Sequence, residues 1–541
     1  MTGPELRAHV DVETRPLGAS VDPMIYGHFL ESAFFGNIEG GLYDEGSPLS
    51  YDDGPLAGCR SDVLEACREL GIPVLRWPGG NFTSAYWWQD GIGPRADRPR
   101  RFELAWGSEE SNHFGTPEFL AWCEAVGAEP YLAHNCRSVE DAVRWVEYTN
   151  YAGTTDFARA RRDDGRDEPW GVRIWGLGNE VYGPWQVAHR SAAQYVVDAR
   201  QHAQFMRAVD PGLKFVAVGS PQDEWTDTVV AGLGGVADWF SLHLYAASEH
   251  LMTPTVEEFD ACVGQPAFFE RTIHDYARRI AELADKHGLD RPPAIAMDEW
   301  NIRHVEPASW SEPKPGEDGG TAERELPGDP WEGGSLRVNR YGSRTLADAL
   351  FYAGVFHTLH RAAGLTVPVT MANTVNLINA NGLINVRPHG MVRTASYHVW
   401  DLYLNHFGRT PTRSTVETPA RFSAARTSDE QRGPDGRSLG LPTAIPYLDV
   451  SSARDGERLT VAAINRSADS PITVSLTLDG RSGLPGTATV RELGGASVDL
   501  FAANRIGDEP VVTLSAPYQV SLESGQVTLA PRSITLLTLE V

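Results

Sequence analysis

Hydrophobic and polar residues follow two different patterns along the chain. Residues 6–12 alternate between apolar and polar types, which predicts a strand with one buried face. The same alternation returns after about residue 387 and is clearest over 472–479. Further short strands are predicted at 459–464, 487–491, 511–514, 526–529 and 533–541. Together they favour an antiparallel β-sandwich that includes the N-terminal strand.

Between these two regions, short apolar runs alternate with helical stretches. The runs lie at 24–31, 74–78, 130–135, 172–180, 214–220, 238–245, 294–300 and 367–376. The main helices are predicted at 61–70, 116–126, 191–209, 268–287 and 344–363, with Ser61 and Thr116 as N-caps and Gly71 and Gly127 as stops. Eight buried strands separated by helices or loops predict an α/β fold, the (β/α)8 TIM barrel. A doubly wound sheet is the alternative, disfavoured because no strand is followed by a Gly-rich phosphate-binding turn.

These patterns divide the chain into three segments. Residues 1–18 hold the N-terminal strand that joins the sandwich, residues 19–386 form the barrel, and residues 387–541 form the C-terminal sandwich. The stretch 302–341 is rich in Pro, Gly, Glu and Asp and is long for a connection without secondary structure, so it is either a loop that rims the pocket or a surface excursion without a role. Residues 426–441 have the composition of a surface insertion.

Composition narrows the classes of function. The 541 residues carry 47 Lys and Arg against 72 Asp and Glu, which gives a formal net charge of −25. Such a surface repels phosphate backbones and anionic lipid, so we expect no nucleic acid and no membrane partner. The five cysteines show no paired spacing, which argues against a disulfide framework or a structural zinc site. No signal peptide is visible and no run of 18 apolar residues occurs, so a cytoplasmic location is expected.

The carboxyl ends of the predicted barrel strands are unusually polar. In a (β/α)8 barrel this end of the strands carries the active site. The polar residues found there are Glu31, Asn81, Asn135, Asn179, Glu180, His243, Tyr245, Glu299, Asn373 and Asn376. Any one of them could simply mark where a strand meets water. Two carboxylates that follow almost continuous apolar runs are harder to explain in that way.

Glu180 and Glu299 end the fourth and seventh predicted strands, on opposite sides of an eight-stranded ring. Carboxyl groups placed there can converge on the two faces of a sugar, and glycoside hydrolysis needs one of them protonated and the other ionised. The pair favours a retaining glycosidase with Glu180 as general acid/base, and Asn179 suits a sugar hydroxyl. An endo-acting glucanase or xylanase and a non-catalytic carbohydrate-binding protein are the alternatives. Motifs of nucleotide-dependent enzymes, zinc proteases and serine hydrolases are absent, so no cofactor and no metal are expected.

Several short motifs of the barrel region follow one another in the order of a known family. They are LYDEGSPL at 42–49, LRWPGGNF at 75–82, DGIGP at 90–94, NHFG at 112–115, GAEPY at 127–131, WGLGNE at 175–180, GPWQ at 183–186 and DEWN at 298–301. Together they resemble glycoside hydrolase family 51, the α-L-arabinofuranosidases. The resemblance implies a (β/α)8 barrel with a jelly-roll-like sandwich. It also implies exo cleavage of terminal arabinofuranosyl groups from oligosaccharides or polysaccharides, with retention and without a metal.

The resemblance also assigns residues. Glu180 falls on the acid/base position and Glu299 on the nucleophile position. The expected sugar-binding residues are Glu31, Asn81, Asn179, Tyr245 and Asn373, with Trp106 and His243 lining the pocket. Asn373 stands where the family commonly has Gln. Many members are intracellular and form trimers or hexamers, so a homo-oligomer is expected.

Three stretches depart from the family pattern, all at strand ends. Ser32–Phe35 replace the usual His-Leu-Gly-Arg, Cys136–Val139 replace a Gly-Thr-Gly-Thr turn, and Tyr182 stands where Asp or Trp is frequent. The two carboxylates are unaffected. The identity of the sugar and its linkage stay open, and another furanoside is an alternative substrate.

Overall fold

One sheet of the structure closes into a barrel. The computed structural model describes residues 4–541 apart from 222, 308–335, 425–443, 483 and 485. The eight parallel strands are, in order around the ring, β2 (Gly27–Phe29), β3 (Val74–Trp77), β6 (Glu129–His134), β7 (Ile174–Leu177), β8 (Lys214–Ala217), β9 (Trp239–Ser248), β10 (Ala294–Pro307) and β12 (Val369–Thr374). β10 pairs with both β9 and β12, and β12 pairs with β2, which closes the ring. The predicted (β/α)8 barrel is confirmed.

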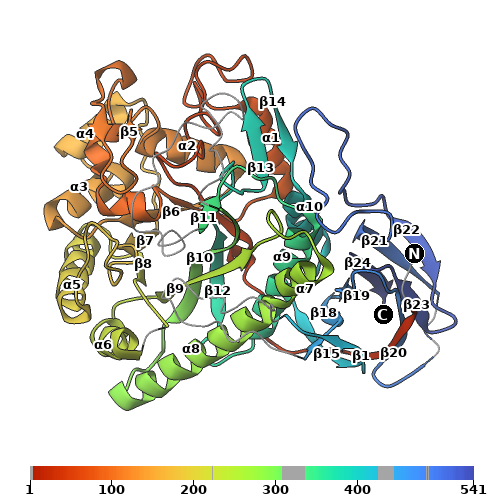
Figure 1. Ribbon diagram of the computed structural model, residues 1–541. Coiled ribbons are helices and arrows are strands. Elements are labelled where there is room, and N and C mark those ends of the chain that lie inside the picture. Colours follow the sequence, from red (N-terminus) through yellow and green to blue (C-terminus); the bar gives the residue numbers. More distant parts are fainter. Residues whose placement is uncertain (1–3, 222, 308–335, 425–443, 483, 485) are drawn as a thin grey trace.

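Helices cover the outside of this barrel (Figure 1). They are α1 (Ser61–Leu70), α2 (Thr116–Val126), α3 (Val139–Asn150), α4 (Asp156–Asp163), α5 (Ala192–Val209), α6 (Asp223–Leu233), α7 (Val256–Gly264), α8 (Pro266–His287), α9 (Leu346–Ala362) and α10 (Ala395–Asp401). Gly71 and Gly127 end α1 and α2 with φ of 69° and 86°, a conformation that glycine adopts without steric cost. The predicted N-caps are wrong: Arg60 and Gly115 hold those positions, and the Ser61 hydroxyl donates instead to the carbonyl of Leu49.

The second sheet contains both ends of the chain. Its strands are, in order, β22 (Tyr518–Ser521), β21 (Thr487–Gly494), β24 (Ser533–Glu540), β19 (Arg458–Asn465), β18 (Leu448–Asp455), β15 (Pro411–Glu417), β1 (Leu6–Pro16), β20 (Ile472–Leu478) and β23 (Gln526–Leu529). Figure 1 shows β1, in red, among the blue C-terminal strands. Apolar residues from β1, β18, β19, β20, β21 and β24 form one separate core. The predicted C-terminal β-domain with the N-terminal strand is confirmed, although β1 and β20 run parallel.

Two local predictions fail. Residues 511–514 form no strand and contribute only a single bridge, between Leu493 and Leu514. The stretch 302–341 is structured at both ends, because β10 continues to Pro307 and pairs antiparallel with β11 (Leu336–Asn339). The middle of that stretch and the predicted insertion at 426–441 lie outside the described residues.

Helix α9 joins the barrel to the second sheet. All its residues except Arg361 are buried, and it contacts α8 on one side and β18, β19 and β24 on the other. His360 bonds Ser451 of β18 (2.8 Å) and Tyr26 below the barrel strands (2.7 Å). Among the described residues, none of the helices has the length and apolar character that crossing a membrane would require.

Candidate active site

Glu180 and Glu299 meet at the carboxyl end of the barrel. Glu180 follows β7 through Gly178, at φ 93°, and itself has φ 43°, so the chain turns sharply where the strand ends. Glu299 lies within β10, in register with His243 of β9. A carboxyl oxygen of Glu180, a ring nitrogen of His243 and a carboxyl oxygen of Glu299 all lie within 4.8 Å of one another. The strands therefore bring together two carboxyl groups and one imidazole.

Glu180 is held by side chains from two neighbouring segments. His243 Nδ1 lies 2.7 Å from its Oε1, and the indole N–H of Trp185 donates to its Oε2 at 3.1 Å. Burial raises the pKa of Glu180, but the hydrogen bond and positive charge of His243 outweigh it, with help from Trp185, so the pKa lies below its usual value. In this arrangement Glu180 ionises more easily than an ordinary glutamate.

Glu299 receives two further donors. Arg76 Nη1 donates to its Oε1 at 3.0 Å, and the Tyr245 hydroxyl donates to its Oε2 at 2.8 Å. Burial raises the pKa of Glu299; the charge of His243 lowers it, the negative charge of Glu180 raises it, and the net pKa lies above its usual value. Because Glu180 and Glu299 repel each other, the proton on one controls the ionisation of the other.

Arg76 and His243 balance the negative charge of the site. Arg76, fully buried on β3, donates to Asn179 Oδ1 at 2.5 Å as well as to Glu299. Burial lowers the pKa of His243, but Glu299, Asp298 and Glu180 around it raise the pKa to about 10. His243 is therefore a cation at neutral pH, with Nδ1 facing Glu180 and Nε2 facing Asp298 Oδ1 at 3.3 Å. Asp298 also accepts from the Tyr131 hydroxyl at 2.8 Å.

A third carboxyl group, Glu31, lies at the end of β2. Its Oε1 accepts three N–H groups, from Gly80 (3.2 Å), Phe82 (3.0 Å) and the indole of Trp106 (3.1 Å). Burial raises the pKa of Glu31 to about 8, more than the Phe82 N–H lowers it, and the charge of Glu299 adds to the increase. Glu31 is therefore a neutral acid below about pH 8, able both to accept and to donate hydrogen bonds.

Comparison with known proteins identifies the family. Residues 66–262 match the family model of the alpha-L-arabinofuranosidase 1 domain, and residues 298–533 match that of the alpha-L-arabinofuranosidase C-terminal domain. A solved α-L-arabinofuranosidase of Thermotoga maritima, in complex with arabinose, superimposes with a TM-score of 0.80 at 32% identity, over 99% of this chain and 100% of that one. An "Intracellular exo-alpha-(1->5)-L-arabinofuranosidase" of Streptomyces lividans is 30% identical over 94% of this chain and 72% of its own length. The chain belongs to glycoside hydrolase family 51, the α-L-arabinofuranosidases.

A fungal relative aligns over a shorter region. The "Probable alpha-L-arabinofuranosidase C" of Aspergillus fumigatus is 40% identical over 52% of this family 51 chain, and this chain spans 57% of that protein's length.

The structure places most of the predicted site residues around the two carboxylates. Asn179, His243 and Tyr245 touch the pair directly or through Arg76. Asn81 accepts a hydrogen bond from Gln186, which also faces Glu180 Oε2 at 3.4 Å. Asn373 is fully buried on β12 and donates to the carbonyl of His28 at 2.9 Å.

Sequence reasoning missed several contributors, among them Gln186 and the three that follow. Arg76 lies inside the LRWPGGNF stretch, where a charge in an apolar strand was a usable signal. Asp298 precedes Glu299, and Trp185 follows Glu180 by five positions. Nothing in their local sequence shows that Asp298 holds His243 or that Trp185 bonds Glu180.

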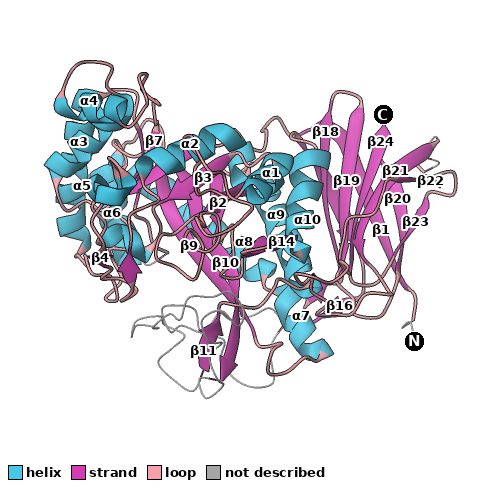
Figure 2. Ribbon diagram, turned by 90° about the horizontal axis from the view of Figure 1, so that it is seen from above, coloured by secondary structure: helices cyan, strands magenta, loops and turns pink. Residues whose placement is uncertain are grey.

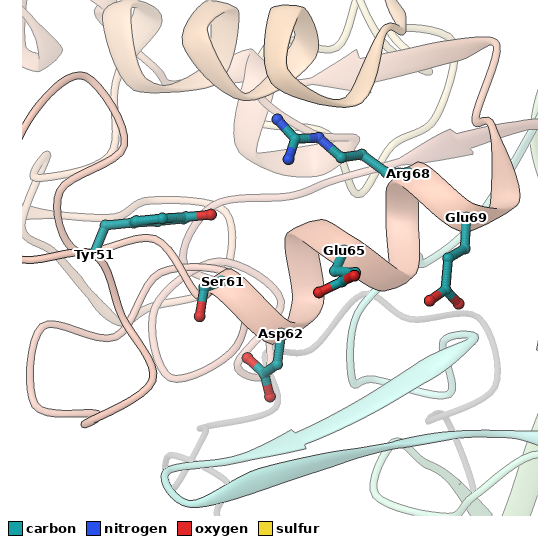
Figure 3. Close-up of a pocket in the computed structure, with 6 residues that line it drawn as sticks. All are labelled: Tyr51, Ser61, Asp62, Glu65, Arg68 and Glu69. Atoms are coloured by element: carbon teal, nitrogen blue, oxygen red, sulfur yellow. The ribbon is translucent and has the colours of Figure 1, made fainter.

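Two other features within the described part of this family 51 chain show no comparable arrangement. An open depression of about 610 Å³ lies on the outer side of α1 and is lined by polar residues (Figure 3); its Arg68 donates to the carbonyl of Ala125. Among the described residues, the second group with metal-ligand chemistry is His134, Cys136 and His202. There His134 Nδ1 already accepts the Cys136 N–H at 3.0 Å, and the positive charges of Arg137 and Arg190 lie close by, which disfavours a cation.

Proposed function

We propose that this chain is a retaining, exo-acting α-L-arabinofuranosidase, with Glu299 as nucleophile and Glu180 as general acid/base. The observation that carries the proposal is a pair of carboxyl groups, Glu299 buried and Glu180 partly exposed, with oxygens within 4.8 Å of each other, at the carboxyl end of a family 51 barrel. Retaining glycosidases hold their two carboxyl groups about 5–5.5 Å apart, whereas inverting enzymes need about 6.5–9.5 Å to admit a water. The observed proximity supports retention.

The first step breaks the glycosidic bond. A carboxylate oxygen of Glu299 attacks the anomeric carbon while Glu180 gives its proton to the leaving oxygen, so a glycosyl ester forms and the aglycone departs as an alcohol. In the second step Glu180 accepts a proton from water, and the resulting nucleophile attacks the same carbon. The Glu299 carboxylate is then released, and the sugar keeps its anomeric configuration.

The proton that Glu180 needs for the first reaction step is already present in the free site. With His243 charged and both glutamates ionised, the three groups hold one proton, which lies on a nitrogen 2.7 Å from Glu180. Moving that proton to Glu180 leaves a neutral imidazole, a protonated acid and an ionised nucleophile. The protonated Glu180 no longer repels the charge on Glu299, so the pKa of Glu299 falls, while Arg76 and Tyr245 remain as donors to its carboxylate.

The remaining residues would bind the sugar. Asn179, whose Oδ1 is fixed by Arg76, has a buried amide nitrogen that bonds none of the described residues. This nitrogen suits the 2-hydroxyl, a contact that strengthens in the transition state. Glu31, with Trp106 bonded to it, suits a hydroxyl that both donates and accepts. Asn81, Tyr245 and Asn373 complete the proposed contacts.

The test uses purified full-length protein and an aryl α-L-arabinofuranoside. Glu299→Ala should lower kcat by about 10⁴-fold or more, since the covalent route is lost. Glu180→Ala should retain far more activity on a substrate with a good leaving group than on an arabino-oligosaccharide, because a good leaving group needs little acid help. The exposed Glu523→Ala, in the turn between β22 and β23, is the matched control. Wild-type turnover in Glu299→Ala with a confirmed mass would contradict the assignment.

The alternative is a retaining enzyme acting on another furanoside, or endo on a glucan or xylan. Departures at Ser32–Phe35, Cys136–Val139 and Tyr182 favour the first of these. A panel of aryl furanosides and pyranosides, with arabinan and xylan as polymers, separates them. Arabinose alone as the early product supports exo cleavage, whereas a ladder of oligosaccharides indicates endo cleavage.

We further propose a cytoplasmic homo-oligomer, a trimer or hexamer, acting on oligosaccharides or polysaccharide fragments. The word "intracellular" in the name of the Streptomyces relative supports the location. Light scattering coupled to gel filtration tests the assembly. The domain boundaries 1–18, 19–386 and 387–541 also remain a proposal, which limited proteolysis can check.

A further inference from the structure

The hairpin formed by β10 and β11 begins inside the active site and extends beyond the barrel. Figure 2 shows the two strands projecting together from the barrel wall. On the β10 side, Arg303 follows the nucleophile Glu299 by four positions. On the β11 side, Arg340 follows Asn339 directly. His304 and Asn339 are paired across the hairpin. Arg303 in β10 and Arg340 just after β11 therefore stand one position closer to the barrel than this pair.

Arg303 lies over the aromatic residue that bonds the nucleophile. Its guanidinium carbon is 3.9 Å from the centroid of the Tyr245 ring, a close cation–π distance. Tyr245 is buried, and its hydroxyl donates to Glu299 Oε2 at 2.8 Å. Arg303 thus packs on one face of the Tyr245 ring, and the hydroxyl of Tyr245 is bonded to the Glu299 carboxylate.

Arg340 lies over a different aromatic group, on the Glu31 side of the pocket. Its guanidinium carbon is 5.1 Å from the ring of Phe34, 4.8 Å from that of Phe35 and 5.8 Å from that of Trp106. Phe34 packs on Trp106 with centroids 4.6 Å apart, and these rings form a small apolar cluster. Trp106 donates its indole N–H to Glu31. Phe34 and Phe35 belong to the stretch Ser32–Phe35, which departs from the family pattern.

We propose that Arg303 and Arg340 are positioning residues, which hold Tyr245 against Glu299 and Trp106 against Glu31 from the base of a single hairpin. The inference rests on the proposed function, since it assigns a role within the same site. A guanidinium placed on a ring face fixes the plane of that ring, and the direction of the hydroxyl or N–H at its edge follows. The two arginines act on different carboxyl groups, so their loss has different kinetic consequences.

Loss of Arg340 affects sugar binding. Trp106 and Glu31 contact no reacting atom in the proposed mechanism, so their misplacement weakens ground state and transition state equally and raises KM with little change in kcat. Loss of Arg303 affects the nucleophile, so kcat falls. From the strength of a desolvated cation–π contact, the expected change in each case is about 2- to 30-fold.

The experiment measures kcat and KM of the full chain on an aryl α-L-arabinofuranoside for Arg303→Gln, Arg340→Gln, Arg303→Lys and Arg340→Lys. Lysine keeps the cation and should restore part of the loss, whereas a purely structural role would not separate Gln from Lys. Arg166→Gln is the matched control, because Arg166 lies 5.4 Å over Trp170 and pairs with Glu124 away from the site; both constants should stay at wild-type values.

A double-mutant cycle tests whether Arg340 affects KM through Trp106. Trp106→Phe removes the N–H and keeps an aromatic ring, so adding Arg340→Gln to it should raise KM no further. Arg340→Leu, which suits the apolar cluster, replaces the Gln variant in the cycle if that protein does not fold. Full additivity, equal constants for Gln and Lys, or wild-type kinetics in the Gln variants overturns the inference. An inactive wild-type protein would instead overturn the proposed function.

Discussion

The raised pKa of Glu31 predicts how the free energy of unfolding changes with pH. Its carboxyl group is buried, all three of its donors point at one oxygen, and its pKa is raised to about 8. Glu31→Gln reproduces the protonated form, because the amide oxygen can accept the same three N–H groups. A folded-state pKa above the unfolded value of 4.5 stabilises the protein below pH 4.5, and this contribution is lost as pH rises through about 8.

One pKa unit corresponds to about 1.4 kcal/mol, so the wild-type protein should lose about 3–4 kcal/mol relative to Glu31→Gln between pH 5 and pH 8. The glutamine substitution removes this titration. The other groups titrate in both proteins, so their contributions cancel in the difference except for the coupling of Glu31 to Glu299. Urea unfolding followed by tryptophan fluorescence at pH 5, 6.5 and 8 measures it, with the exposed Glu523→Gln as control. A difference in unfolding free energy that does not change with pH would refute the reasoning.

Three further results are expected. His243→Gln removes the charge that lowers the pKa of both catalytic glutamates, so the acidic limb of the kcat/KM profile should move to higher pH; an unchanged limb speaks against this role. Gly80→Ala places a Cβ 2.8 Å from Glu299 Oε1, so kcat/KM should fall by about 10- to 100-fold. Gly235→Ala is its control: the added Cβ meets open space, so kcat/KM should stay unchanged. Leu459→Ala in the core of the second sheet should lower the unfolding free energy by about 2–5 kcal/mol while kcat of the folded protein stays constant; a fall in kcat at a temperature where the variant is folded would show coupling between the domains.

The barrel was predictable because its strands are buried on both faces. Such strands are short, nearly continuous apolar runs. For seven of the eight strands, the predicted end lies within a few residues of the observed end. β10 is the exception. Its outer half carries polar residues such as Asn301 and Arg303 and leads into a Pro- and Gly-rich stretch, and its strand conformation is set by pairing with β9 and β11, which no local pattern contains.

The site was predictable in its carboxylates and less so in what surrounds them. Glu180 and Glu299 stand out because each ends an apolar run. Arg76 stands out equally, but the sequence does not say which of many distant acids and amides a buried arginine will bond. The position of His243 between Glu180, Glu299 and Asp298 depends on the register of β9 against β10, and the N-cap of α1 depends on a carbonyl twelve residues earlier that uses the Ser61 hydroxyl. Such contacts are set by the tertiary fold.

Strand β1 is synthesised long before the strands that pair with it in the second sheet. It lies between β15 and β20, and its pairing partners for residues 9–12 are residues 414–417 on one side and 475–478 on the other. At about 5–20 residues per second, a ribosome needs roughly 20–90 s to deliver those partners after β1 has been made. Throughout that interval the strand that carries Val10 and Val12, which are buried in the folded protein, has no partner strand to pair with. The barrel, complete in sequence by then, can fold first, and the nascent chain must keep an apolar strand unpaired beside it until the last domain arrives.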